Sequence, residues 1–335
     1  MRRYVQLDLV GRDWWIPFTA FWIVTLLSLA AQRLLSPPGY SAAAKLGPML
    51  VVVLVFLAVG VIVSSIYTII LYSIVFPKVS LGDKSLAFDG AIGPYLGIVV
   101  PGLLLSLVTA GVYAAWFSRR VTAYLAAHTR LCGRPFEFSG TGGKLFVYAL
   151  VTLVAPVLVV SAGIAVLVPA ASGAGVSVSA VEIVIDVAPF IILLSLVPFV
   201  YLRYKWYTNL RWSGLLLQWE THFWPAVLTI LGQALLTVVT IGVYWPAAAL
   251  RLYRYFVDRS VVIDSGEEAG RFGFDGHIGR GFGLLWGQAL LSIVTLGFYL
   301  PWAYSKVGRW ILGATWYESS RSIPRAGESD VTPPL

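Results

Sequence analysis

The sequence predicts an all-α, polytopic membrane protein, and three observations support that class. The chain of 335 residues is 58% hydrophobic and only 12% charged, whereas soluble globular proteins carry about 25% charged residues. Its apolar residues form continuous runs near 14–35, 46–76, 95–117, 145–170, 183–202, 223–250 and 281–304. A helix needs roughly 20 such residues to cross a bilayer, and the runs lack the period-two alternation of membrane β-strands.

The runs define the elements in order. We expect about seven hydrophobic helices, together with short basic amphipathic helices that lie at the membrane interface. Residues 1–80 are expected to form an N-terminal pair of membrane helices, and residues 81–318 a membrane domain with repeats near 88–124, 219–255 and 274–310. Residues 319–335 are polar and are expected to form a disordered tail.

The internal repeat is the most informative feature of the membrane domain. Residues 232–246 read GQALLTVVTIGVYWP and residues 287–301 read GQALLSIVTLGFYLP, identical at ten of fifteen positions. A looser copy, PGLLLSLVTAGVYAA, covers residues 101–115. The chain therefore uses one membrane-embedded module several times.

Each copy carries polar side chains at helical spacing. Offsets of i, i+4 and i+7 place them on one face of a helix. Because polar groups in hydrocarbon need partners, this stripe is expected to face protein or a wet cavity. Packing between repeats and the lining of a polar pathway are both open interpretations. The stripe consists of Ser106, Thr109, Gln233, Thr237, Thr240, Gln288, Ser292 and Thr295.

A basic, aromatic segment follows each copy. Pro246 and Pro301 cannot continue the preceding helix but suit the first turn of a new one. The basic residues recur at fixed offsets, which predicts helices that lie at the interface and turn cations toward lipid headgroups. Phosphate or anionic-lipid recognition is the sharper hypothesis for them. These residues are Arg119, Arg120, Arg203, Arg251, Arg254, Lys306 and Arg309.

The topology has two competing solutions. Seven simple crossings divide the 24 Lys and Arg residues into 10 and 14, which is almost no positive-inside bias. If the three repeats are re-entrant, only Arg33 and Lys45 lie outside and 22 of the 24 are cytoplasmic. Short re-entrant limbs require protein or water around their backbone, so seven crossings are the expected count.

The loops offer little chemistry. The segment 129–140, with Phe136-Glu-Phe138, predicts a short β-hairpin between membrane segments. The pairs Glu220/His222 and Asp275/His277 are too weak a pattern for a metal site, and no metal or cofactor is expected. The single Cys132 excludes an internal disulfide. No nucleophile and base pair stands out, so we do not expect an enzyme.

Several of these strings together resemble the YjgN-like family of bacterial inner-membrane proteins, domain-of-unknown-function family 898. The resemblance covers roughly Leu86 to Tyr317. It is carried by Phe88-Asp-Gly, Phe136-Glu-Phe-Ser-Gly and the Thr-x-Gly-x-Tyr-x-Pro-Trp run that ends at Trp302, with the basic helix that follows. The chain departs from the pattern at Ala115, where proline is usual, and around Asp89 and Trp219. The resemblance implies a location in the bacterial inner membrane and carries no activity, while the apolar runs predict a multi-pass protein.

Two functions are therefore expected from the sequence. Internal repeats, broken helices and intramembrane polar groups are features of transporters, which favours a transporter or channel for a small or anionic solute. The alternative is a non-enzymatic membrane-organising or accessory protein that binds anionic lipid headgroups or a protein partner. Candidate partners are the bilayer, its anionic headgroups, a second copy of the chain or another membrane protein. The net charge of +8 is assigned to headgroups, not to nucleic acid.

Overall fold

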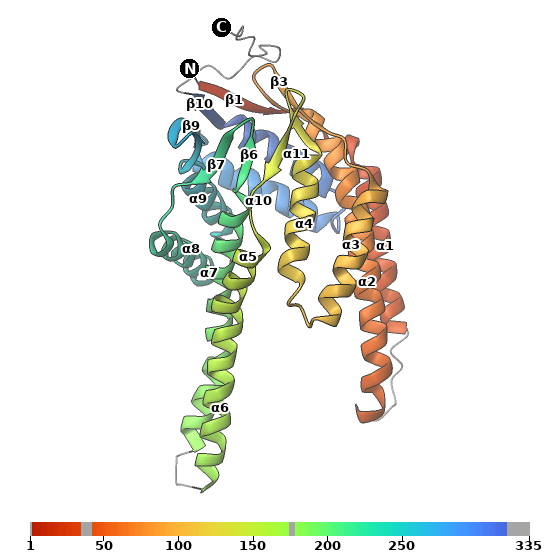
Figure 1. Ribbon diagram of the computed structural model, residues 1–335, viewed down its shortest axis with the longest axis vertical. Coiled ribbons are helices and arrows are strands. Elements are labelled where there is room, and N and C mark those ends of the chain that lie inside the picture. The colour runs from red at the N-terminus through yellow and green to blue at the C-terminus, as the bar shows by residue number, and fades with distance from the viewer. Residues whose placement is uncertain (1, 35–41, 174–177, 320–335) are drawn as a thin grey trace, which may run out of the picture.

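The computed structural model describes residues 2–34, 42–173 and 178–319, and it shows a mixed α/β protein (Figure 1). The expected all-α class is wrong, because ten strands close into an antiparallel β-barrel in which β1 lies between β2 and β10. The strands are β1 (Arg2–Leu7), β2 (Val79–Leu81), β3 (Lys84–Phe88), β4 (Thr129–Leu131), β5 (Arg134–Phe138), β6 (Leu210–Trp212), β7 (Leu215–Trp219), β8 (Ser260–Asp264), β9 (Glu267–Phe274) and β10 (Thr315–Ser319).

A pair of helices connects β1 to β2, and the same holds for β3 and β4, β5 and β6, β7 and β8, and β9 and β10. The order strand–helix–helix–strand therefore occurs five times in the described ranges. The pairs are α1 (Trp15–Leu34) with α2 (Ala42–Val75), α3 (Ile92–Val108) with α4 (Ala114–Ala127), α5 and α6 (Gly142–Ala149 and Ala155–Gly173) with α7 (Val178–Tyr207), α8 (Phe223–Val239) with α9 (Trp245–Val257), and α10 (Ile278–Val294) with α11 (Leu300–Gly313). A π-helical turn, Leu150–Val154, joins α5 to α6. Short 3-10 helices, Gly11–Asp13 and Phe76–Lys78, adjoin α1 and α2.

Two-residue turns join successive units at the barrel. Cys132 and Gly133 both have positive φ, of 54° and 76°, and the same holds for Ser213 with Gly214 and for Ser265 with Gly266. Positive φ at both central residues is the backbone of a type I′ turn, whose twist matches that of paired strands. The hairpin predicted at 129–140 is confirmed as the β4–β5 pair.

The fifth junction, between β10 and β1, is built from the two ends of the chain. Arg2, Arg3 and Tyr4 pair with Glu318, Tyr317 and Trp316. The helices beside this junction pack in the same way as the helices between the second and third units. Trp116 of α4 covers Gly142 so closely that a Cβ there would lie 2.8 Å from the indole, and Trp302 of α11 covers Gly11 at 2.5 Å. The last unit therefore packs on the first as the second packs on the third.

An ion pair fixes the base of the first unit. The Lys78 ammonium lies 2.7 Å from the Asp13 carboxylate, which also accepts a hydrogen bond from the amide of Val10. The Lys78 hydrogen bond, followed by the Val10 amide, holds the pKa of Asp13 below its usual range. The pair joins the start of α1 to the end of α2 at the point where both helices meet the barrel.

The helical pairs have two lengths, and this difference overturns the expected count of seven spans. In the described residues, three helices are long and apolar enough to cross a membrane: Leu54–Lys78, Gly142–Val166 and Asp186–Tyr207. In Figure 1 the α1–α2 pair and the α6–α7 pair extend furthest from the barrel, whereas α3–α4 stops well short of them. The apolar runs 95–117, 223–250 and 281–304 are each two short helices folded back on one another.

The physical reason is the turn inside each run. Two helices of 17 and about 14 residues read as one long apolar segment when the turn between them contains only a few residues, most of them apolar. Pro246 and Pro301 do begin new helices, as predicted, since α9 and α11 start one residue before them. The predicted interfacial helices are thus the returning limbs of hairpins.

Two further expectations concern the polar tail and the N-terminal helical pair. Ser319 ends β10, while residues 320–335, which carry most of the predicted polar tail, lie outside the described part of the chain. Residues 2–7 and 79–80, from the predicted N-terminal helical pair, lie in strands β1 and β2 of the same barrel as the repeats.

The closure of the barrel can be tested with one engineered disulfide. Arg2 and Glu318 face each other across β1 and β10, with side chains in ionic contact at 3.5 Å. Paired residues of neighbouring antiparallel strands have Cα atoms about 4.5–5.5 Å apart, within the range that a disulfide spans. Arg2→Cys with Glu318→Cys, in a Cys132→Ser background, should therefore form a circular chain on oxidation. The faster migration of that product on a non-reducing gel measures it.

The control pair is Arg2→Cys with Glu267→Cys, since Glu267 lies on β9 opposite Asp264 and not opposite β1. Equal oxidation of the two pairs would contradict the closure of β1 on β10.

Candidate functional site

The repeated Thr-x-Gly-x-Tyr string forms the turn at the tip of each short hairpin. The Thr240 hydroxyl donates to the carbonyl of Leu236, one turn back in α8, at 2.8 Å. The same oxygen accepts the amide hydrogen of Tyr244, at 3.1 Å, at the start of α9. Thr109 and Thr295 make equivalent pairs of bonds. One hydroxyl thus ends the first helix and begins the second.

The residues between this threonine and tyrosine expose apolar side chains. Ala110, Ile241 and Leu296 have φ near 50°, and a glycine with φ between 83° and 89° follows each of them. Ile241 is 93% exposed and Leu296 is 78% exposed, and Val108 at the end of α3 is 85% exposed. Exposed apolar side chains concentrated at the end of an element mark a surface that meets apolar surroundings.

The hydroxyls of the predicted polar stripe are satisfied within their own helices. Ser106, Thr237 and Ser292 donate to the carbonyls of Gly102, Gln233 and Gln288, at 2.7–2.8 Å. Such i−4 bonds need no partner from another helix. The hydroxyls therefore neither join neighbouring repeats nor point a donor along a pathway.

The glutamines of the stripe belong to a second arrangement, which the sequence did not reveal. In the α8–α9 hairpin the Tyr244 hydroxyl donates to Gln233 Oε1 at 2.9 Å, and Arg251 donates to the Tyr244 hydroxyl. In the α10–α11 hairpin the Tyr299 hydroxyl donates to Gln288 Oε1 at 3.0 Å, and Lys306 Nζ donates to that hydroxyl at 2.8 Å. We call this arrangement the Gln–Tyr–cation relay. It links both limbs of the hairpin.

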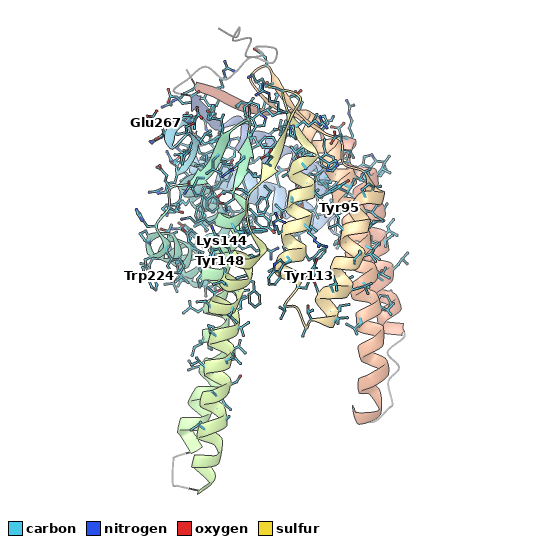
Figure 2. The ribbon with its side chains drawn as sticks, in the orientation of Figure 1. Tyr95, Tyr113, Lys144, Tyr148, Trp224 and Glu267 are labelled. Carbon is cyan, nitrogen blue, oxygen red and sulfur yellow. The ribbon has the colours of Figure 1, made fainter. Side chains whose placement is uncertain are left out.

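The α3–α4 hairpin keeps the cation and the tyrosine but not the amide. Gly102 replaces the glutamine, and Phe117 occupies the space where its side chain would begin, since a Cβ at Gly102 would lie 2.1 Å from that ring. Tyr113, at the end of α4 furthest from the barrel (Figure 2), has a buried hydroxyl that makes no hydrogen bond. The Arg120 guanidinium lies over its ring at 5.7 Å.

The three cations of these hairpins share an environment. Each lies seven residues after the tyrosine and over its ring, at 5.4–5.7 Å. A position seven residues along an α-helix lies about 10 Å from the tip. Among the described residues none of the three forms an ion pair, because the pairs present involve other basic side chains. We call Arg120, Arg251 and Lys306 the relay cations.

The other predicted basic residues have local partners in place of a common site. Arg119 Nε donates to the carbonyl of Gly140 in the next unit, and Arg203 donates to the Tyr207 hydroxyl. Arg254 pairs with Asp258 at 3.6 Å, and Arg309 Nε contacts the carbonyl of Ser305 at 3.4 Å. The structure therefore separates the predicted set into relay cations and structural contacts.

On α4 and α9 the relay cation lies on the face of the helix opposite to the one that lines a cavity. Residues 121, 122, 125 and 126 of α4 line one cavity, and residues 252, 253, 256 and 257 of α9 line another. In both helices these positions lie one, two, five and six residues after the cation. Because successive residues of an α-helix are rotated by about 100°, these four positions face on average the side opposite to the cation. The inner faces are apolar, and the cations lie on the outer faces.

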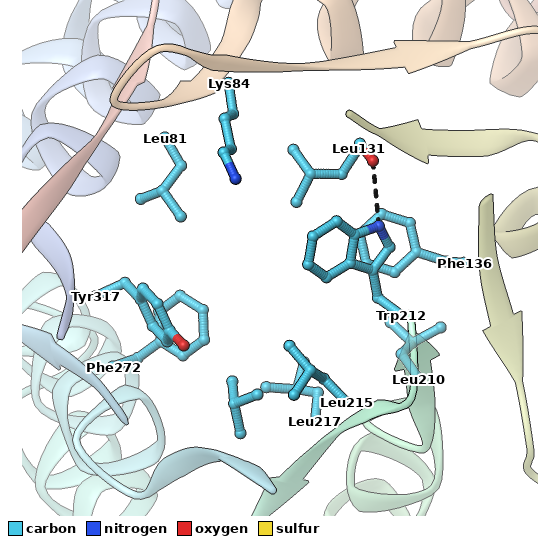
Figure 3. Close-up of a pocket in the computed structure, with 11 residues that line it drawn as sticks. Leu81, Lys84, Leu131, Phe136, Leu210, Trp212, Leu215, Leu217, Phe272 and Tyr317 are labelled. Carbon is cyan, nitrogen blue, oxygen red and sulfur yellow. Dashed lines mark hydrogen bonds between the residues drawn. The ribbon is translucent and has the colours of Figure 1, made fainter. Parts of the chain in front are cut away.

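The interior of the barrel was missed by the sequence analysis. Nine of the strands, β2 to β10, contribute side chains to a cavity of about 160 Å³ inside it. Figure 3 shows these side chains pointing inward, with the Lys84 ammonium directed into the opening. We call this cavity the lumen. The lining residues are Leu81, Lys84, Leu131, Phe136, Leu210, Trp212, Leu215, Leu217, Val262, Phe272 and Tyr317.

The acid–histidine pairs do not form a metal centre. Within the described residues no group of three His, Cys, Asp or Glu side chains comes together in a way that could hold an ion. His222 and His277 stand at the N-caps of α8 and α10. Asp275 accepts hydrogen bonds from Tyr4 at 3.0 Å and from Trp316 at 2.9 Å, which ties the end of β9 to β1 and β10.

The fold and these hairpins define a class: a closed β-barrel whose strands are joined in pairs by helical hairpins, with three described helices long and apolar enough to cross a membrane. The chain belongs to the family described as "Bacterial protein of unknown function (DUF898)", which matches residues 83–262, more than half of its length. The resemblance found in the sequence is thereby confirmed.

Similarity to individual proteins is partial. The chain is 32% identical over 72 residues to "Inner membrane protein YjgN" of Salmonella typhimurium and 32% identical over 73 residues to the protein of that name from Escherichia coli K12. Each match covers 22% of this chain and 18% of the relative, so the aligned part spans less than a fifth of these relatives. No solved structure matches the chain significantly.

The role of the turn threonine can be measured by removing its hydroxyl at constant shape. Thr240→Val should lower the free energy of unfolding by about 1 kcal/mol, since it leaves the Tyr244 amide without its acceptor. Thr229→Val is the matched control, because Thr229 lies in the same helix and makes only the i−4 bond, to Pro225. Denaturant unfolding in detergent compares the two. An equal loss for both would mean that the hydroxyl has no special role at the tip.

Proposed function

We propose that this protein is a non-enzymatic component of the bacterial inner membrane that binds the phosphates of anionic lipids with the relay cations of its short hairpins. The observation that carries the proposal is the repeated placement of a cation, with no acidic partner among the described residues, two helical turns from an exposed apolar tip. The relatives named inner-membrane proteins and the three candidate spans support the location.

Helix lengths set the depth of the hairpins. Helices α2 and α7 have 34 and 30 residues, which correspond to about 50 and 45 Å, and the 17 residues of α3 correspond to about 25 Å. If the long pairs cross a core of about 30 Å, the short tips enter it by about 5–10 Å. That is the depth of interfacial helices. A cation about 10 Å behind the tip then lies at the level of the phosphates.

The chemistry of the relay suits a phosphate. The Tyr244 hydroxyl occupies one donor of Arg251, and the Tyr299 hydroxyl one donor of Lys306. A guanidinium has five N–H donors and an ammonium three, so donors remain for the ligand. Hydrogen bonds from these cations to phosphate oxygens are short and strong. The relay holds each long side chain in one orientation, which reduces the entropy lost on binding.

The distribution of basic residues supports a cytoplasmic position for the barrel. Of the described Lys and Arg residues, only Arg33 and Lys45 lie near the ends of long helices that are furthest from the barrel. The chain has no basic residue between Lys144 and Arg203, which covers most of the second long pair. Basic residues are retained on the cytoplasmic side of inner-membrane proteins. The re-entrant topology considered from the sequence also left only Arg33 and Lys45 on the outer side.

Sidedness can be measured with single cysteines in the turns of the barrel. Native Cys132 lies in the β4–β5 turn, and Ser265→Cys in a Cys132→Ser background places a thiol in the β8–β9 turn. A membrane-impermeant maleimide should label both only after the cells are permeabilised. Labelling of either turn in intact cells would contradict a cytoplasmic barrel.

Lipid binding is tested by removing two relay cations. Arg251→Gln with Lys306→Gln should lower the affinity for anionic lipid about fivefold at each site, since a basic residue near an anionic surface contributes about 1 kcal/mol. Native mass spectrometry of the purified protein, titrated with phosphatidylglycerol, measures bound lipid. Phosphatidylcholine is the ligand control.

Arg254→Gln with Arg309→Gln is the matched protein control. It removes the same charge from the same two helices, but from side chains that already have partners in the protein. If both double variants lose lipid equally, net charge and not the relay is responsible, and the proposal fails.

Transport of a small or anionic solute is the second candidate, because the helical pairs surround the axis of the barrel. The hydroxyls expected to line its pathway are bonded within their own helices, which removes part of the argument for it. Solute flux in reconstituted vesicles that falls with Gln233→Leu and Gln288→Leu, while lipid binding is retained, would favour transport.

A further inference from the structure

The interior of the molecule contains a second cavity directly below the lumen. About 430 Å³ in volume, it lies between α2, α4 and α7 and the adjoining ends of β3 to β6. We call it the chamber. Its lining is apolar and aromatic apart from hydroxyl groups, and Phe136 and Leu210 line both the chamber and the lumen. The two cavities therefore adjoin along the axis of the barrel.

The size and chemistry of these spaces suit an apolar ligand. An eight-stranded barrel can hold one small ligand, and the diameter grows with strand number, so ten strands leave more room. Ligand pockets occupy about 300–1,000 Å³ and are lined mainly by apolar and aromatic side chains with a few polar groups.

The only charged side chain in the described lining of the two cavities is at one end of the axis. Lys84 follows the β2–β3 turn, at the end of the barrel away from the helices, and its ammonium points into the lumen (Figure 3). The chamber lies at the opposite end, where Val121 and Leu125 of α4 face Tyr72 of α2. A ligand that fits both ends has an acidic head and a long apolar tail.

We propose that the lumen and chamber bind one single-chain anionic amphiphile, with its acidic head at Lys84 and its acyl chain extended through the lumen into the chamber. The chamber lies between the helical pairs that enter the membrane, so the bilayer is the source of such chains. The site is distinct from the relay cations, of which only Arg120 lies on a helix that lines the chamber, and it does not depend on the lipid binding proposed for them.

The probe is a palmitate analogue with a photoreactive diazirine at the end of its chain, added to the full-length protein in nanodiscs. Irradiation should attach it to the chamber residues Val121, Leu125 or Tyr207, identified by peptide mass spectrometry. Unlabelled palmitate and a lysophosphatidic acid of the same chain length compete in separate arms and show which head is preferred. The corresponding monoacylglycerol, which has no charge, should compete about tenfold more weakly than the preferred acid.

Two variants make the test decisive. Lys84→Met keeps a long side chain without the charge and should reduce chamber labelling about tenfold, because hydrogen bonds to charged groups are among the strong ones. Arg211→Met is its matched control, since Arg211 is exposed on β6 between the lining residues Leu210 and Trp212. Val262→Phe narrows the lumen and should also reduce chamber labelling while thermal unfolding confirms that the variant is folded.

Labelling that survives Lys84→Met unchanged, or that falls equally with Arg211→Met, overturns the proposal. So does labelling confined to the outward tips, such as Ile241. Phosphatidylglycerol binding by the relay cations is measured separately, and Arg251→Gln with Lys306→Gln should leave chamber labelling unchanged. Failure of one proposal is therefore distinguishable from failure of the other.

Discussion

The constraint on which the structure depends is that both ends of every helical pair must reach the same rim of one closed barrel. Each pair leaves the barrel from one strand and returns to the next, so both ends of a pair lie at the same end of the barrel. Any segment folded in this way can vary in length without disturbing its neighbours, because only its two ends are fixed. This explains how long and short helical pairs coexist around one axis. The ladder of backbone hydrogen bonds from β1 to β10 carries that constraint, and its closure leaves no edge strand unpaired.

Apolar runs and repeats were readable from the sequence because they extend over many residues. The hairpin at 129–140 was also readable, since Phe136 and Phe138 alternate with polar residues beside a Gly. The other strands were missed, although Trp212-Ser-Gly-Leu215 and Asp264-Ser-Gly-Glu267 carry comparable two-residue turn signals. Strands of three to five residues are too short for a period to stand out next to long apolar helices. Pairing β1 with β10 depends on residues more than 300 positions apart, for which no local pattern exists.

In the candidate site, too, some features could be read from the sequence and others could not. The spacing of Gln233, Thr240 and Tyr244 was correctly read as recurrent, but the partners within it could not be assigned from a helical wheel. A wheel assumes one continuous helix, whereas the chain reverses direction between Thr240 and Tyr244. The reversal brings Tyr244 back beside Gln233, eleven positions earlier, and directs the threonine hydroxyl to the backbone of the new helix. Polar residues that suggest a pathway in a straight helix therefore complete a turn in a folded one.

The separation of polar and apolar faces on the returning helices follows from this geometry. On α4 and α9 one face lines an apolar cavity, and the opposite face carries the relay cation. In the proposed placement, the long side chains of Arg251 and Lys306 reach the phosphate level, where their charge is solvated. A charge on the inner face has no such escape, which accounts for the apolar lining of α4 and α9. Tyr253 illustrates the cost: burial raises the pKa of its phenol, and its hydroxyl is paired with Thr315, 2.9 Å away, which lowers it. An interior with such an apolar lining selects against hydrated solutes and in favour of chains that carry no polar atoms along their length.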